Sequence, residues 1–140
     1  MTARVRKAFV VVAVVAVAAS VLGGLLLLGS PLTERERRFD ARRVTDMRAL
    51  ASAVDLYWSR QGQLPSSLAA LSQERGIQVN RIDPDSGQPY DYRVIGENSY
   101  ELCAQFARDA SEENRGRRGD FWTHGSGSQC FRLAPKTVKR

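Results

Sequence analysis

A run of 22 residues, from Ala8 to Gly29, contains no charged side chain and only one polar residue, Ser20. A helix rises about 1.5 Å per residue, so this run would extend about 33 Å and would cross the roughly 30 Å hydrocarbon core of a membrane. It would also satisfy its own backbone hydrogen bonds in lipid. The 111 residues after it are too few to bury such a helix on all sides. We therefore expect residues 8–29 to be a transmembrane segment.

A cleavable signal peptide is the alternative interpretation of this segment. The stretch Ala16–Ala18 has the small residues of a cleavage site after an apolar region. Cleavage there would leave a mature chain whose largely apolar start, from Ala19 to Leu28, would be exposed to water. We therefore expect an uncleaved signal anchor over residues 8–29, with residues 1–7 in the cytoplasm.

The charges that flank the apolar segment give a nearly tied positive-inside count, because three basic residues precede it and three come closely after it. These residues are Arg4, Arg6 and Lys7 before the segment, and Arg35, Arg37 and Arg38 after it. A first span near the N-terminus usually translocates the part of the chain beyond it, and two cysteines that could pair suit an oxidising compartment. We expect a single-pass protein of the inner (cytoplasmic) membrane, with its C-terminal domain periplasmic or otherwise extracytoplasmic.

The net charge of +6 does not indicate nucleic-acid binding. Residues 1–7 contribute +3 and residues 30–61 contribute +2, whereas residues 62–140 contribute only +1. A nucleic-acid-binding protein would concentrate its positive charge on the folded domain. We therefore expect no nucleic-acid partner. The expected partners are the lipid bilayer and one or more envelope proteins that the sequence does not identify.

A second copy of the chain is a further candidate partner, through the membrane helix. Ala16, Ser20 and Gly24 recur every four residues and would share one helix face. Small residues allow two helices to approach closely, so these three form a candidate helix-pairing face. Alanine and glycine are also common in any membrane span, and this composition alone explains the pattern.

Residues 30–61 are predicted to form a stalk and packing helix. Apolar residues recur in steps of three and four from Val44 onward, which is the spacing of one helix face. They are Val44, Met47, Ala51, Val54 and Trp58, with Leu50 and Tyr57 beside them. The preceding turns are highly charged, so we expect a solvated stalk that becomes half-buried from Val44. Gly62 and Pro65 should end the helix.

Residues 62–133 are predicted to form a small α+β head, with a polar tail after it over residues 134–140. Its expected elements are a short helix from Ser66 or Ser67 to Gly76, a turn over residues 83–89, a hairpin from Tyr90 to Phe106 that turns at residues 96–98, and short strands at Phe121–Trp122 and Cys130–Leu133. The charged residues 108–119 should form a solvated loop. The fold class is thus an N-terminal transmembrane helix that continues into a long amphipathic helix packed on a small antiparallel sheet.

The alternation in the hairpin leaves open which sheet face the helix covers. The candidates are the face that bears Tyr90, Tyr92 and Val94 and the face that bears Leu102 and Phe106.

A series of short motifs occurs between about Asp46 and Phe106. They are the helix segment Ala49–Tyr57, the break Gly62–Pro65, the segment Leu68–Leu71, the turn Asp83–Pro84 ahead of Gly87–Tyr92, and the strand Ser99–Leu102. In this order and spacing they resemble type IV pilins and the pseudopilins of type II secretion. The resemblance implies a helix packed on a sheet and a structural or interaction role in the bacterial envelope. The prepilin-peptidase site of those families is missing, because no Gly precedes Phe9 and Ala13 stands about where their Glu is expected.

Cys103 and Cys130 are the only cysteines. In a small extracytoplasmic domain they should form a structural disulfide, which would close a loop of about 28 residues and contribute roughly 3.5 kcal/mol. A redox-active pair is less well supported, since the chain has no Cys-x-x-Cys motif.

The remaining polar residues give no catalytic or metal-binding pattern. His124, the only histidine, would need Cys103 and Cys130 as partners in a zinc site, but a disulfide would occupy both. Ser126 lies two residues after His124 in a glycine-rich loop without the nucleophile-elbow motif. An EF-hand that started at Asp83 would have a valine at its twelfth position instead of glutamate. We expect no enzyme activity, no cofactor and no metal site.

Two functional hypotheses remain. The first is a non-catalytic, membrane-anchored structural or interaction protein with a pseudopilin-like extracytoplasmic domain. The alternative is a ligand- or metal-binding sensor domain on a membrane anchor. Its candidate ligand loop contains Trp122 and His124. Three tyrosines would line the same site, namely Tyr90, Tyr92 and Tyr100.

Overall fold

The computed structural model of the chain describes residues 3–27, 30–110 and 120–138. The chain divides into two compact units, Met1–Arg35 and Glu36–Arg140. Some of the sequence predictions lie outside the described residues. They concern the last two residues of the apolar run, the charged residues Glu112, Glu113, Arg115, Arg117 and Arg118, and the last two residues of the tail.

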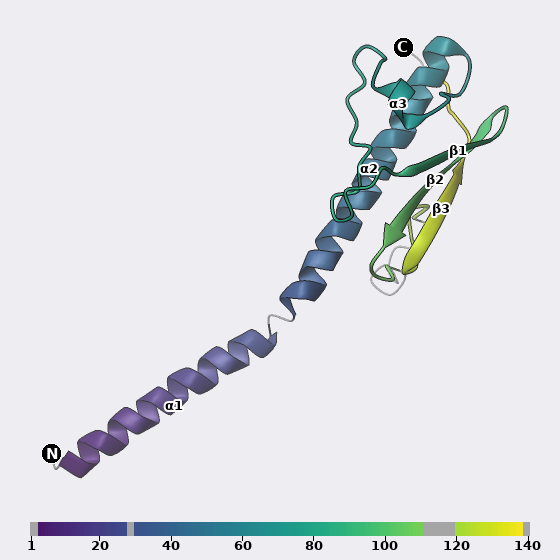
Figure 1. The fold of residues 1–140 in the computed structure, drawn as a ribbon. Helices are drawn as coiled ribbons and strands as arrows, with labels where there is room; N and C mark the ends of the chain where they lie inside the picture. The colour runs from purple at the N-terminus through teal and green to yellow at the C-terminus, as the bar shows by residue number, and fades with distance from the viewer. Residues whose placement is uncertain (1–2, 28–29, 111–119, 139–140) are drawn as a thin grey trace. The chain divides into compact units, whose positions relative to one another are not determined.

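Helix α1, Ala3–Leu27, contains most of the apolar run (Figure 1). None of its residues is buried, and its large side chains, such as Phe9, are exposed. Ser20 does not interrupt the helix, because its hydroxyl donates a hydrogen bond to the carbonyl oxygen of Ala16 at 2.8 Å. The helix is long and apolar enough to cross a membrane.

Helix α2, Pro31–Gln61, confirms the long second helix. Proline suits the first turn of a helix, where its missing N–H would have no partner in any case. The helix ends where predicted. Gly62 adopts a φ of +70°, which glycine tolerates best, and its N–H donates to the carbonyl oxygen of Trp58 at 2.8 Å.

The buried face of α2 differs in part from the predicted one. Met47, Leu50 and Val54 are fully buried as expected, but Trp58 lies outside the core. Burial begins at Asp40, not at Val44 as predicted. Hydrophobic periodicity does not detect the first buried turns of this face, because they consist of charged residues that are paired in the fold.

Helix α3, Leu68–Leu71, is a single turn capped by Ser67, whose hydroxyl accepts a hydrogen bond from the N–H of Ala70. The predicted helix was longer and ended at Gly76. The chain instead continues through turns from Ser72 to Gly76, because only Leu68 and Leu71 supply apolar side chains to hold a helix against the core.

Within the described residues, the sheet has three antiparallel strands, β1 (Asp91–Gly96), β2 (Ser99–Phe106) and β3 (Gly127–Leu133), in the order β1-β2-β3. The hairpin of β1 and β2 and the terminal strand confirm the sequence predictions. The strand predicted at Phe121–Trp122 is wrong. The side-chain carboxylate of Asp120 accepts a hydrogen bond from the N–H of Trp122. The backbone there forms a local turn instead of a strand.

The strand register shows that the two candidate sheet faces are the same face. Tyr92 is directly opposite Leu102, and Val94 is opposite Tyr100, so both sets of apolar residues belong to the same face. This face meets α2. The outer face carries the remaining residues, among them Glu101 and Arg132, whose side chains form an ion pair at 3.0 Å.

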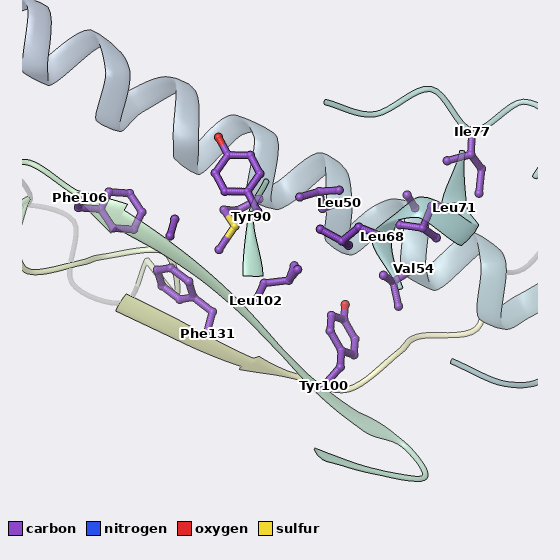
Figure 2. Packing of buried hydrophobic residues seen from close by; sticks show 13 residues of the cluster. Leu50, Val54, Leu68, Leu71, Ile77, Tyr90, Tyr100, Leu102, Phe106 and Phe131 are labelled. Atoms are coloured by element: carbon purple, nitrogen blue, oxygen red, sulfur yellow. The ribbon is translucent and has the colours of Figure 1, made fainter. Parts of the chain in front are cut away.

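The core of the second unit lies between α2, α3 and the inner face of the sheet. Figure 2 shows Leu50 and Val54 of α2 facing Leu102 and Tyr100 of β2. The buried hydrophobic members of this core are Met47, Leu50, Ala53, Val54, Leu68, Leu71, Ile77, Tyr90, Tyr100, Leu102, Ala104, Phe106 and Phe131.

The described part of the polar tail lies along α2. The N–H of Lys136 donates to the carboxylate of Asp55 at 2.8 Å, and the N–H of Val138 donates to the hydroxyl of Ser59 at 2.8 Å. The tail is therefore hydrogen-bonded to the same helix that supports the sheet.

Candidate functional site

A buried cluster of charges joins α2 to the loop that precedes β1. Arg43 is only 3% exposed and lies between two buried carboxylates. Its Nη1 donates to Oδ1 of Asp40 at 2.7 Å, and its Nε and Nη2 donate to the two carboxylate oxygens of Asp83. Asp85, which is half exposed, is a weaker partner of the same guanidinium at 3.5 Å. The two-pronged contact with Asp83 is the strong geometry for an arginine–carboxylate pair.

Asp83 also organises its own loop. Its Oδ1 accepts the N–H groups of Asp85 and Ser86, both at 2.9 Å, which confirms the turn role predicted from the sequence. Burial alone would raise the pKa of Asp83, but the hydrogen bonds from Arg43 and from the two N–H groups outweigh it and lower that pKa to about 2. The pKa of Arg43 is raised, mainly by its hydrogen bond to Asp83.

Asp40 links the same cluster to the end of β2. Its Oδ1 accepts the N–H of Ala107 at 3.0 Å, and its Oδ2 accepts the N–H of Arg108 at 2.9 Å. Each buried carboxylate is therefore compensated both by Arg43 and by backbone donors, as a buried charge requires.

A second polar group lies beside the first on α2. The carboxylate of Asp46 accepts hydrogen bonds from the hydroxyl of Tyr90 at 2.9 Å and from the side-chain amide of Asn80 at 2.8 Å. Burial, and then the interaction with Asp46, raises the pKa of Tyr90. The hydroxyl of Tyr92 is also occupied, because it donates to the carbonyl oxygen of Pro65 at 2.9 Å.

The carboxylates of these clusters are bonded to donors of the protein itself. The cation among Asp40, Asp83 and Asp85 is the guanidinium of Arg43, and Asp91 is a residue of β1 opposite Cys103. Within the described residues, no group of three or more His, Cys, Asp or Glu residues could hold a metal ion.

The low pKa of Asp83 predicts acid sensitivity. Its carboxylate has a lower pKa when folded than the ordinary value of 3.8, so its contribution is complete above about pH 4 and is lost as the pH falls towards 2. The shift corresponds to about 2 kcal/mol. Urea unfolding of Asp83→Asn at pH 5 and pH 2 should show a pH dependence weaker by about this amount. Glu97→Gln, in the exposed hairpin turn, should keep the dependence of the unaltered protein, and an equally steep dependence in Asp83→Asn would contradict the prediction.

A cleft of about 330 Å³ lies beside α2, next to the loop with the predicted ligand residues Trp122 and His124. The structure brings both residues to its wall, together with charged residues of both signs. Across it, Nη2 of Arg48 donates to the carboxylate of Asp120 at 3.0 Å. A cleft of this size, with both polar and apolar side chains in its wall, can take a small ligand.

The surroundings of His124 agree with a role in holding the loop. Its ring is buried and stacks on Phe106, with 3.6 Å between the ring centroids. Its Nδ1 lies 3.3 Å from the carbonyl oxygen of Gly125. The structure gives no hydrogen bond between His124 and Ser126, so the described residues provide no paired base and nucleophile there.

A second cavity, of about 590 Å³, lies between α2 and the end of β3. Tyr100 and Trp122 line it together with Asp55 of α2. The hydroxyl of Tyr100 is buried and has no hydrogen-bond partner among the described residues. Burial, and then the nearby carboxylate of Asp55, raise the pKa of this hydroxyl.

The two cysteines form the expected disulfide, which connects β2 to β3. Cys103 and Cys130 are directly opposite each other in the strand register, on the outer face of the sheet. Cys103 therefore cannot provide a zinc ligand together with His124 while the disulfide is intact.

Replacing Cys130 with Ala should destabilise the head by about 3 kcal/mol, because the unfolded chain is no longer constrained by the cross-link. Membrane insertion should be unaffected, since α1 contains no part of the bridge. Thermal unfolding in detergent and carbonate extraction measure the two effects. A variant as stable as the parent protein would show that the disulfide does not stabilise the head.

The candidate helix-pairing residues lie together on α1 as predicted. The hydroxyl of Ser20 is already bonded to Ala16, and a Cβ added at Gly24 would contact nothing within 4 Å. Pairing of this face with another helix stays a prediction.

Sequence reasoning missed Asp40, Arg43 and Asp46, which it assigned to the solvated stalk or left unassigned. Their spacing along the helix could have identified them. Asp40 and Arg43 precede Met47, Leu50 and Val54 in steps of three and four, so they share the buried face. Charged residues that continue an apolar stripe in this way point to buried pairing.

Comparisons of the chain with protein-family models, curated proteins and solved structures found no match.

Proposed function

We propose that the protein is a non-catalytic, single-pass membrane protein with a structural or protein-interaction role in the bacterial envelope. The observation that carries this proposal is α1, a helix of 25 residues with no buried residue and no charge between Ala8 and Leu27. A large apolar surface of this kind is unfavourable in water and calls for a lipid environment or a protein partner.

The disulfide supports an extracytoplasmic position of the head, because such bonds persist in oxidising compartments. Together with the single span, it supports a cytoplasmic N-terminus and a periplasmic C-terminal domain.

A pseudopilin-like head is part of the proposal. Its support is the packing of a long helix, α2, against a small antiparallel sheet, in the same order as the sequence motifs. The span lacks the Gly and the Glu of the prepilin-peptidase site, so the proposal includes an unprocessed N-terminus. A mature chain that began at Phe9 with a methylated amine would overturn this part.

An interaction role is supported by the surface of the sheet. Within the described residues, β1 and β3 are both edge strands and can accept another strand. Val94 and Ile95, near the tip of the β1–β2 hairpin, are 49% and 44% exposed. Exposed apolar residues beside a free strand edge are typical of a protein contact.

The topology is tested with alkaline phosphatase fused after Arg140. The fusion should be active, and the protein should stay in the membrane fraction during carbonate extraction. An inactive fusion, or a soluble mature protein that begins at Ala19, would contradict the anchor. A membrane pull-down with the tagged full-length chain then identifies the partner.

The alternative is a ligand-binding sensor, and the specific observation in its favour is the cleft beside Trp122 and His124. The buried hydroxyl of Tyr100, which has no hydrogen-bond partner in the part of the chain that the structure describes, adds to it in the neighbouring cavity. Metal analysis of the purified protein, and thermal shifts with and without divalent ions, separate the two functions. A stabilising shift that Trp122→Ala abolishes would favour the sensor.

A further inference from the structure

Three residues form a row across the outer face of the sheet. Asp91 of β1 is the register partner of Cys103 on β2, and Cys103 is the partner of Cys130 on β3. Among the described residues no strand lies beyond β3 (Figure 1). The disulfide therefore joins one sulfur in the middle of the sheet to one sulfur at its edge.

The two cysteines differ in accessibility. Cys103 is 5% exposed, whereas Cys130 is an exposed residue. A cavity of about 360 Å³ does reach Cys103, but Asp83 and Asp91 also line it. Asp83 is already paired with Arg43, but the carboxylate of Asp91 repels an incoming thiolate, so this route disfavours attack on Cys103.

The geometry of the exchange reaction makes the exposure of each cysteine important for which sulfur is attacked. A thiolate attacks one sulfur of a disulfide from the side opposite the other sulfur, which leaves. Attack on Cys130 comes from beyond β3, where the sheet ends. The cavity that reaches Cys103 is lined by its register partner on β1, Asp91.

The sulfur that would leave has a cation beside it. Nη2 of Arg93, on β1, lies 3.8 Å from Sγ of Cys103. A nearby arginine stabilises a thiolate, and a better-stabilised thiolate leaves faster. Accessibility and electrostatics therefore both favour attack on Cys130, with the sulfur of Cys103 as the leaving group.

We propose that the Cys103–Cys130 disulfide is a site of directional thiol–disulfide exchange. An incoming thiolate forms a bond to Sγ of Cys130, the bond between the two cysteines breaks, and its electron pair goes to Sγ of Cys103. The products are a mixed disulfide at Cys130 and a thiolate at Cys103 beside Arg93. The thiolate comes from a small thiol or from a cysteine of another protein.

The direction is tested on the oxidised full-length protein in detergent. The protein is briefly exposed to reduced glutathione, quenched with acid, alkylated and digested for peptide mass spectrometry. Glutathione should be found on Cys130 and the alkyl group on Cys103, in at least about 10-fold excess over the reverse. A parallel reaction uses a thioredoxin variant that keeps only its attacking cysteine. An adduct with glutathione alone points to small thiols, and an adduct with both points to a protein partner as well. Adducts in equal amounts on both cysteines, or mainly on Cys103, would overturn the proposal.

The role of Arg93 is tested separately from folding. Arg93→Gln should slow the opening of the disulfide roughly 3-fold, the effect of about one pKa unit in the leaving thiol, without lowering the melting temperature. Arg93→Lys should restore the rate, because it keeps the charge. Arg75→Gln, which removes an exposed charge from the loop after α3, should leave the rate unchanged. A rate for Arg93→Gln equal to that of the unaltered protein would refute the assignment of Arg93.

Discussion

Replacing Arg43 with Met should lower the free energy of unfolding of the head by about 3–5 kcal/mol. The guanidinium compensates the carboxylates of Asp40 and Asp83, both of which are about 5% exposed or less. Methionine fills a similar volume but leaves the two negative charges buried without a cation. Because small domains have only about 5–15 kcal/mol of stability in total, the variant should be partly unfolded at room temperature.

Tryptophan fluorescence during urea unfolding measures this effect, since both tryptophans, Trp58 and Trp122, belong to the second unit. Arg42→Met is the matched control. Arg42 is largely exposed and contacts Asp46 only at 3.6 Å, so its loss should cost less than about 1 kcal/mol. Adding Asp40→Asn and Asp83→Asn to Arg43→Met should recover part of the stability. Equal effects of the Arg42 and Arg43 variants would show that the buried cluster does not stabilise the head.

Replacing Val54 with Asp should unfold the head. Val54 is 0% exposed, at the centre of the core between α2 and the sheet. An aspartate there would have to lose its hydration without gaining a cation, or become protonated, at a cost of roughly several kcal/mol. Far-UV circular dichroism should then lose the sheet signal, whereas the α1 helix should remain in detergent.

Ser52→Asp is the appropriate control for this substitution. Ser52 is exposed on the same helix, and its hydroxyl donates to the carbonyl oxygen of Arg48. Arg42→Asp would be a poorer control, because it would place a negative charge beside the buried Asp46. If Val54→Asp melted at the same temperature as Ser52→Asp, the packing of α2 on the sheet would be wrong.

Local sequence signals predicted the elements of the fold well. The apolar run predicted α1, and Gly62 ended α2 through the left-handed conformation that glycine adopts most easily. The change to a period of two predicted the β1–β2 hairpin, and the cysteines predicted the bridge to β3. Each of these signals comes from a backbone or burial requirement within a few residues.

The candidate site was harder to predict, because it depends on residues that are distant in sequence. Asp83 is a turn residue, as its sequence context predicts, but nothing close to it indicates a bond to Arg43. Phe121 and Trp122 resemble a strand because both are aromatic, yet the side chain of Asp120 turns the backbone there. The clefts beside Trp122 arise from the arrangement of α2 against later segments, which no local pattern encodes.

The charge cluster on α2 also has a consequence for the rates of folding and unfolding. Arg43 reaches Asp83 across 40 residues, and Asp40 reaches the N–H groups of Ala107 and Arg108 across 67 and 68 residues. The entropy of closing such long loops must be overcome before these bonds form, whereas the β1–β2 hairpin closes locally. We therefore expect the cluster to form late, after the β1–β2 hairpin, and to contribute little to the transition state. Its loss should then act mainly by accelerating unfolding, so Arg43 should affect the lifetime of the folded head more than the rate at which the head forms.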